Sequence, residues 1–361
     1  MFKRIIAGVL STVICSSAIT SGAPDQSAWA VTTGALNDAT RVYDENIPKT
    51  EDDSSVRTTI KAVPDKSTII ETVALGENIT ADIYSNGLLR ISGYGDMNNF
   101  GRSPFQNAAA VKQILFEDAD AEKGLVISSI GNYAFSGMTF LHCSSYGSAD
   151  KAAAGIIVLP DGIRSIGEYA FQNCTGITSF TVPDSVTSIG GQIFNGCVNL
   201  KELTLPYAAT SKAVAAGEEN ADAYTSVADL FMYSWIDSYN DGMDFSAYAI
   251  EKITITGGEI VPNYAFSNMK TLKTIDLSGT KVTSLGGHAV NNCTSLESIK
   301  LPSTLKNIGS YAFQNCTAIK KLDLPDSIET IAENAFQNCT GIISFTVPDS
   351  VTSIGGQIFN G

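Results

Sequence analysis

The sequence predicts an α/β repeat solenoid, rich in β-structure, in which short parallel strands stack into one concave sheet and short helical or 3₁₀ turns join them. Residues 333–361 repeat residues 168–196 with only two changes, so the chain is built from copies of one unit. Phenylalanines and cysteines recur every 23 residues. A unit of this length is too small to bury its own apolar face. Stacking solves this, because the apolar set of each unit then lies on that of the next.

One phenylalanine marks the phase of each unit. Phe171 and Phe194 are 23 residues apart, and so are Phe313, Phe336 and Phe359. A cysteine holds one equivalent position in five units: Cys174, Cys197, Cys293, Cys316 and Cys339. One small side chain per unit predicts a buried packing role. Because stacked neighbours have parallel Cα–Cβ directions, which suit a disulfide poorly, we expect free thiols.

Each unit contains a strand and a turn. In segment 200–205, Leu203 and Leu205 alternate as in a strand, and Pro206, which cannot donate to a sheet ladder, ends it. Segment 308–313 predicts one short helical or 3₁₀ turn. The pattern predicts nine strand rungs: 111–116, 154–159, 177–182, 200–205, 250–255, 272–277, 296–301, 319–324 and 342–347.

The unit resembles a known repeat family. Segments 301–319 (LPSTLKNIGSYAFQNCTAI) and 324–342 (LPDSIETIAENAFQNCTGI) are similar to the BspA-type leucine-rich repeat of bacterial surface and secreted proteins. The resemblance spans residues 111–361 apart from two insertions. It implies a leucine-rich-repeat horseshoe with a concave parallel sheet, and a binding scaffold whose ligand varies from protein to protein.

Residues 1–30 have the pattern of a secretory signal peptide. Lys3 and Arg4 form the charged region, residues 5–19 the apolar region, and Ala28-Trp29-Ala30 a cleavage site after Ala30. The alternative is a membrane anchor, but an apolar run of about 15 residues is short for a span. We therefore expect a secreted or extracellular protein with no membrane span after cleavage.

Residues 31–67 and 68–110 precede the repeats. The first segment is polar and lacks apolar periodicity, which predicts a disordered leader. The second contains a β-hairpin over residues 78–92, because Asn86-Gly87 is a strong hairpin signal in which both residues are expected to have positive φ. We interpret it as a cap that covers the first open strand of the solenoid at 111–361.

Two insertions interrupt the period, near residues 137–153 and 207–248. The first contains Cys143, which we expect outside the strand ladder. The second carries the aromatic residues Tyr233, Trp235 and Tyr239, together with Phe231 and Tyr248. Insertions in solenoids often bind ligands. The alternative is that these aromatic residues form a small core that holds the insertion on the stack.

The chain stops at Gly361, where the duplicated copy continues with Cys197. We expect the last rung to leave an apolar face open. Either the protein continues, with further repeats or a cell-wall attachment region, or a partner covers this face.

Charged residues recur at the outward positions of the predicted strands. Their signs alternate from rung to rung, so neighbouring strands are expected to pair them. Exposed pairs contribute only about 0.2–1 kcal/mol each, which favours a role in register and solubility, with ligand binding as the alternative. The candidate residues are Lys201, Glu202, Glu251, Lys252, Lys273, Asp276, Glu297, Lys300, Lys320, Lys321 and Asp323.

The net charge of −14 and the pI of about 4.5 bear on possible partners. An acidic chain without a basic stripe argues against nucleic acid and against electrostatic docking on anionic membranes. We expect an extracellular protein or glycan as the partner.

The sequence gives little support for a metal site, a cofactor or catalysis. It has two histidines and no C-x-x-C pair. Segment 237–242 has the start of a calcium loop, but Tyr239 and Tyr248 stand where oxygen ligands are needed. His142 and Cys143 are adjacent, yet no recognised nucleophile motif accompanies them. We therefore expect a non-catalytic secreted or cell-surface binding or adhesion module. The alternative is the targeting half of a larger secreted enzyme whose catalytic domain lies beyond Gly361.

Overall fold

The computed structural model describes residues 67–118, 120–138, 143–144, 155–211, 215, 217, 226–232 and 245–361. The predicted signal peptide with its cleavage site at Ala30 lies outside these residues. So does the predicted leader, except for Ser67.

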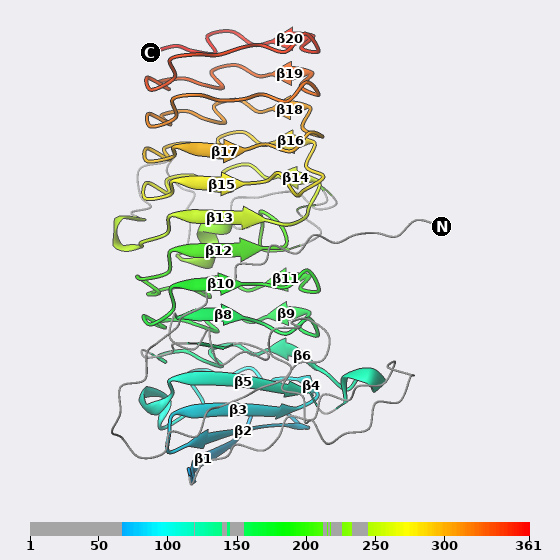
Figure 1. Cartoon of the computed structure of the whole chain (residues 1–361), viewed down its shortest axis with the longest axis vertical. Coiled ribbons are helices and arrows are strands. Elements are labelled where there is room, and N and C mark those ends of the chain that lie inside the picture. Colours follow the sequence, from blue (N-terminus) through cyan, green and yellow to red (C-terminus); the bar gives the residue numbers. More distant parts are fainter. Residues whose placement is uncertain are drawn as a thin grey trace, which may run out of the picture.

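One long sheet of eleven strands runs through the molecule (Figure 1). The first three strands form an antiparallel meander: β1 (Ile69–Ala74), β2 (Ile79–Tyr84) and β3 (Leu88–Gly93). From β3 onward every pairing is parallel. The parallel strands are β5 (Gln113–Asp118), β7 (Cys143–Ser144), β8 (Ile156–Val158), β10 (Ser179–Thr181), β12 (Glu202–Leu205), β13 (Lys252–Ile255), β15 (Thr274–Asp276) and β17 (Ser298–Lys300). The predicted solenoid with a parallel sheet and an N-terminal hairpin is confirmed.

Most units also contribute a second, very short strand, which the sequence did not predict. These strands stack into two parallel short sheets beside the long sheet (Figure 1). One contains β4 (Gly95–Asp96), β6 (Ile127–Ile130), β9 (Ser165–Ile166) and β11 (Ser188–Ile189). The other contains β14 (Ile260–Val261), β16 (Ser284–Leu285), β18 (Asn307–Ile308), β19 (Thr330–Ile331) and β20 (Ser353–Ile354). The second insertion separates them, and Ser211 at its start forms an antiparallel bridge with Ser188.

The described residues also contain 3₁₀ helices: η2 (Ala108–Ala110), η3 (Ala121–Lys123), η6 (Val227–Leu230) and η7 (Phe245–Ala247). The predicted turn at 308–313 has i→i+3 hydrogen bonds, from Ala312 N to Gly309 O (3.2 Å) and from Gln314 N to Tyr311 O (3.0 Å). It is not a continuous 3₁₀ helix, because Tyr311 has a left-handed backbone with φ of 57°.

The hairpin of β2 and β3 forms as predicted, but its turn differs. Gly87 has φ of 90°, whereas Asn86 is not left-handed. Gly87 N donates to Tyr84 O at 2.8 Å. Residues 85–87 therefore form a three-residue loop with one left-handed glycine. On its other side β3 pairs in parallel with β5, which joins the hairpin to the solenoid.

The interior holds one row of phenylalanine rings. Phe171, Phe313 and Phe336 are completely buried, as stacking requires. The ring centroids of Phe135 and Phe171 are 5.1 Å apart, and those of Phe313 and Phe336 are 5.3 Å apart. These rings belong to a single hydrophobic cluster that includes residues from both ends of the array. The units therefore share a continuous core.

The cysteines of the repeat are free and buried, as predicted. Each Sγ lies 2.9–3.1 Å from a backbone carbonyl of the preceding turn, for example Cys174 from Phe135 O and Cys339 from Phe313 O. Burial raises the pKa of Cys197 and Cys293 to about 12. These thiols are therefore protonated at neutral pH and serve as packing groups and weak donors.

The turns are joined to one another along one side of the stack, which we call the turn edge. Each turn donates backbone N–H groups to carbonyls of the following turn, as from Phe313 N to Ala335 O at 2.8 Å. Asparagine side chains form a parallel ladder: Asn292 Nδ2 donates to Asn268 Oδ1 at 2.8 Å, Asn315 Nδ2 to Asn292 Oδ1 at 2.5 Å and Asn338 Nδ2 to Asn315 Oδ1 at 2.9 Å.

Aromatic rings stack on the same edge. Tyr133 and Tyr169 lie with centroids 4.7 Å apart. His288 lies between Tyr264 and Tyr311, with both centroid distances 4.9 Å. The position of His288 is therefore a half-buried stacking site that links three units.

Two predictions about the rungs are wrong. Cys143 lies in β7, between β5 and β8, because the first insertion supplies a rung of its own. The predicted rungs 319–324 and 342–347 do not form regular strands, and only an isolated parallel bridge between Lys321 and Ser344 joins them.

Candidate functional site

The solvent side of the long sheet, which we call the outward face, follows from strand alternation. In β12 and β13, Leu203 and Ile253 point into the core. The residues before them, Glu202 and Lys252, lie opposite each other and point to solvent. Parallel pairing keeps this register in the next rungs, where Thr274 lies opposite Lys252 and Ser298 opposite Thr274, so residues at one strand position form a column.

All eleven predicted charged residues lie at the surface, and only Glu251 and Asp276 are half-buried. Two expected cross-rung pairs form. Lys273 Nζ lies 3.1 Å from Glu251 Oε2, and Lys300 Nζ lies 2.7 Å from Asp276 Oδ2. A third pair, between Lys321 and Asp323 at 2.7 Å, lies within one rung. Five candidates form no ion pair within the described part of the chain: Lys201, Glu202, Lys252, Glu297 and Lys320.

Asp276 illustrates how an ion pair and a hydrogen bond fix a charged side chain of the outward face in place. Partial burial favours a higher pKa, but hydrogen bonds from Lys300 and Ser278 outweigh it and lower the pKa of Asp276 below its ordinary value. Ser278 Oγ donates to Asp276 Oδ1 at 2.6 Å. This carboxylate is therefore fixed by neighbours on two sides, and its charge is already neutralised.

The eleven candidates differ in charge balance from the chain as a whole. They comprise six lysines and five carboxylates, so 6 − 5 gives these residues a net charge of +1. The whole chain carries −14. An approaching acidic molecule therefore meets less repulsion here than the chain's average charge would impose.

A shallow hollow of about 120 Å³ lies at the C-terminal end of the outward face. It occupies the region where the long sheet lacks its regular ladder, on both sides of the Lys321–Ser344 bridge. Its polar lining includes Lys321, Asp323, Asp326, Ser344 and Thr346. Of these, the charge columns included only Lys321 and Asp323.

The second insertion is only partly described. Tyr233, Trp235 and Tyr239 lie outside the described residues, as does most of the calcium-like segment 237–248. Phe231 and Phe245 are buried, and the Phe231 ring lies 5.6 Å from that of Phe194. Phe194 N also donates to Leu230 O at 2.7 Å, where the following turn of a regular unit would lie. This part of the insertion thus replaces a repeat turn and is held on the stack.

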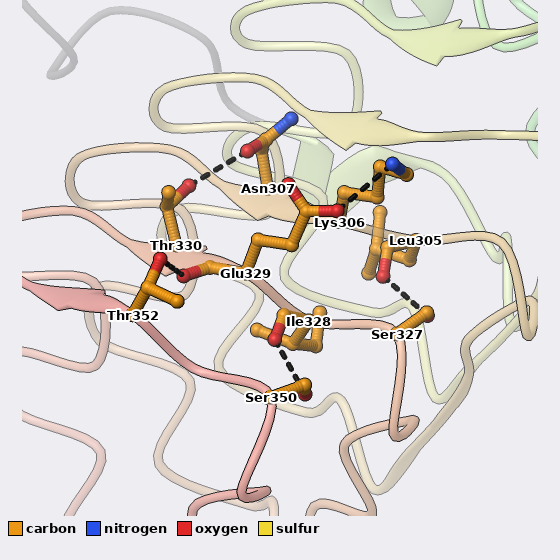
Figure 2. A network of polar contacts seen from close by, with 9 residues as sticks. All are labelled: Leu305, Lys306, Asn307, Ser327, Ile328, Glu329, Thr330, Ser350 and Thr352. Carbon is orange, nitrogen blue, oxygen red and sulfur yellow. Dashed lines mark hydrogen bonds and ion pairs between the residues drawn. The ribbon is translucent and has the colours of Figure 1, made fainter.

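The short sheets carry a polar network that the sequence did not predict (Figure 2). Figure 2 shows Lys306 Nζ 2.8 Å from Glu329 Oε1, and Thr330 Oγ1 donating to Asn307 Oδ1 at 2.7 Å. Serine hydroxyls donate to carbonyls one rung earlier, from Ser327 to Leu305 O and from Ser350 to Ile328 O, both at 2.6 Å. These side chains are occupied with one another, which indicates a role in tying rungs together.

The structure offers no metal centre within its described residues, where no group of three or more His, Cys, Asp or Glu side chains converges. His142 lies outside the described part, so its relation to Cys143 stays a prediction. No helix among the described residues has the length and apolar character needed to cross a bilayer.

The fold and its register define a leucine-rich-repeat solenoid. Residues 150–256 and 240–361 match the family described as BspA type leucine rich repeat region (6 copies). The chain belongs to the BspA-type leucine-rich-repeat family, and the resemblance found in segments 301–319 and 324–342 is confirmed.

Several solved structures are similar to this chain. A leucine-rich repeat protein from Bacteroides ovatus is 19% identical, with 80% of this chain and 92% of that chain covered and a TM-score of 0.29. One from Eubacterium ventriosum is 17% identical, with coverages of 81% and 94% and a TM-score of 0.30. A leucine rich cell surface protein from Faecalibacterium prausnitzii is 16% identical, with coverages of 79% and 94% and a TM-score of 0.30. No curated protein matches the chain.

Proposed function

We propose that this protein is a non-catalytic, secreted or cell-surface binding module that docks an extracellular protein or glycan on its outward face. The observation that carries the proposal is the set of exposed charges that form no ion pair with another described residue, which includes Lys201, Glu202 and Lys252. Family membership supports a scaffold of this kind, since leucine-rich repeats present extended binding surfaces. The signal-peptide pattern of residues 1–30 supports secretion.

The geometry of the long sheet favours recognition by many small contacts. Hydrogen-bonded strands hold the backbone of each column, so little backbone entropy is lost when a ligand binds. Thr181, Thr204 and Thr254 lie in register beside the charged columns and add hydroxyl donors and acceptors. Exposed charges on a rigid sheet influence both the orientation and the rate of association.

A binding assay with two charge-matched variants tests this proposal. Mucin, collagen, fibronectin and a glycan array are immobilised, and binding of the wild type is compared with Lys252→Glu and Lys281→Glu. Both substitutions change the net charge by −2, but Lys281 is an exposed residue outside the predicted columns. For any ligand that binds, we expect Lys252→Glu to lower the affinity about tenfold and Lys281→Glu to change it less than about twofold.

Circular dichroism and thermal unfolding establish that each variant is folded. Two results would contradict the proposal: no binding of the folded wild type to any member of the panel, or equal loss of binding in both variants.

A further inference from the structure

The duplicated segment folds differently in its two places. In the first copy, Ser179–Thr181 forms β10, which is paired in parallel with β8 on one side and β12 on the other. In the second copy the equivalent residues 344–346 keep only the bridge from Ser344 to Lys321. The two copies share the sequence SFTVPDS, at 179–185 and 344–350. The hollow therefore lies where regular strand pairing is lost and where the preceding rung carries Lys321 and Asp323 in place of Ile156 and Val158 of the first copy.

The lining of the hollow combines donors and acceptors. Lys321 pairs with Asp323 at 2.7 Å, which leaves the exposed carboxylate of Asp326 without an ion pair among the described residues. Ser344 and Thr346 add hydroxyl groups from the opposite rung, and Leu324 and Pro348 add apolar surface. One cation and two carboxylates give the hollow a net charge of −1.

We propose that this hollow binds a single neutral sugar residue of a glycan. It rests on the proposed function, because the glycan would be a ligand of the same outward face. A pyranose both donates and accepts through its hydroxyls, and so can complement the carboxylate of Asp326, the hydroxyl of Thr346 and the ammonium of Lys321 together. Leu324 and Pro348 supply the apolar contact that such sites combine with a few directed polar groups.

Other ligand classes fit the lining less well. An anionic group would face Asp326 and the net charge of −1. An ammonium group can donate to Asp326 and to the hydroxyl oxygens, but it offers no acceptor to the ammonium of Lys321 and is repelled by it. The hollow of about 120 Å³ is small and open to solvent, so we expect one ring to enter it while the rest of a glycan stays outside.

The test uses monosaccharide probes and a control that the duplication provides. Binding of glucose, N-acetylglucosamine, glucuronate and ethylamine to the full chain is measured by saturation-transfer NMR and calorimetry. We expect the two neutral sugars to bind with a Kd on the order of 1 mM, and glucuronate and ethylamine to bind at least about tenfold more weakly. Thr346→Val and Asp326→Asn should each weaken sugar binding about tenfold. Thr181→Val makes the same change in the first copy, where Thr181 lies in a regular strand, and should leave binding unchanged.

Each outcome separates this inference from the proposed function. If no neutral sugar binds, if glucuronate or ethylamine binds as well as glucose, or if Thr346→Val and Thr181→Val behave alike, the sugar site is wrong. A macromolecular ligand that responds to Lys252→Glu would then still support the outward face. If sugars bind in the hollow but no panel ligand responds to Lys252→Glu, the sugar site stands and the wider docking surface does not.

Discussion

Left-handed backbone at bulky residues is the residue-level feature that shapes the turn edge. Tyr311, His288 and Tyr264 have φ of 57°, 54° and 60°. Such a conformation costs roughly 1–2 kcal/mol at a residue other than glycine. It brings aromatic rings of successive units face to face at 4.9 Å and lets each turn donate N–H groups to the next. Stacking and hydrogen bonds between rungs offset the backbone cost.

The stack around His288 predicts a pH dependence of stability. Burial lowers the pKa of His288 below 6.5, so the folded state binds its proton less readily than the unfolded state. The neutral side chain therefore stabilises the fold above the unfolded pKa. This contribution declines as the pH falls below about 6.5 and levels off below the folded pKa. Replacing His288 with Tyr, the residue at 264 and 311, should keep the stack and remove the dependence.

Urea unfolding of the wild type and His288→Tyr between about pH 7 and pH 5 measures this effect. The free energy of unfolding of the variant should rise relative to the wild type as the pH falls. A His142→Gln variant, which changes the only other histidine, should follow the wild type. Parallel curves for His288→Tyr and the wild type would refute the prediction.

Some residue-level features could be read from the sequence and others could not. The buried thiols were predictable because one cysteine per unit has to occupy one environment. The left-handed turns were not, because tyrosine, histidine and glutamine rarely adopt positive φ, and only the pairing with the next unit stabilises it here.

At the scale of elements, the spacing between rungs depends on glycines that follow the short strands. Gly309 follows β18 (Asn307–Ile308), and its φ is not left-handed, so conformational freedom is not the reason for glycine. A Cβ atom there would lie 2.6 Å from the backbone carbon of Gly286 and 2.6 Å from the nitrogen of Gly287. The backbones of two units pass too closely for any side chain.

We therefore predict that Gly309→Ala destabilises the protein by about 1–3 kcal/mol, as overpacking does. Gly279→Ala is the matched control, because nothing lies within 4 Å of a Cβ atom at that exposed position. Chemical denaturation should show a lower midpoint for Gly309→Ala only. Equal midpoints for the two variants would mean that the rungs can move apart freely.

The long sheet was predictable because its strands alternate and end at proline, as segment 200–205 does in becoming β12 (Glu202–Leu205). The short sheets were not, because a two-residue strand such as Ser188–Ile189 is too short to show any alternation. β7 was missed because residues 143–144 lack the spaced leucines of the repeat. The repeat period predicted the columns of charged residues. It did not predict the hollow, because the hollow forms where regular strand pairing is lost.

At the scale of the whole molecule, the duplicated segment places the same residues in two different surroundings. Phe194 is completely buried, whereas its equivalent Phe359 is 41% exposed. Ile189 is 3% exposed and its equivalent Ile354 is 50% exposed. The same residues are buried where another described turn follows them and partly exposed in the last described turn, because burial requires a neighbour on both sides.

This contrast predicts unequal costs for the same substitution. Phe194→Ala removes a ring from the continuous core and should cost about 3–5 kcal/mol. Phe359→Ala removes a partly exposed ring and should cost about 1 kcal/mol. Thermal and urea unfolding of both variants measures the difference. Equal losses would contradict the view that each unit depends on its neighbours for its core.

The hydrogen bonds of the turn edge give the stack a direction. Every turn passes its N–H groups forward, as Tyr264 does to Gly287 O at 3.0 Å and Asn315 to Gln337 O at 2.8 Å. The asparagine side chains of the same edge donate in the opposite direction, as Asn315 Nδ2 does to Asn292 Oδ1 at 2.5 Å. Each turn therefore gives backbone protons to the unit after it and side-chain protons to the unit before it, so every joint between two units is fastened from both sides.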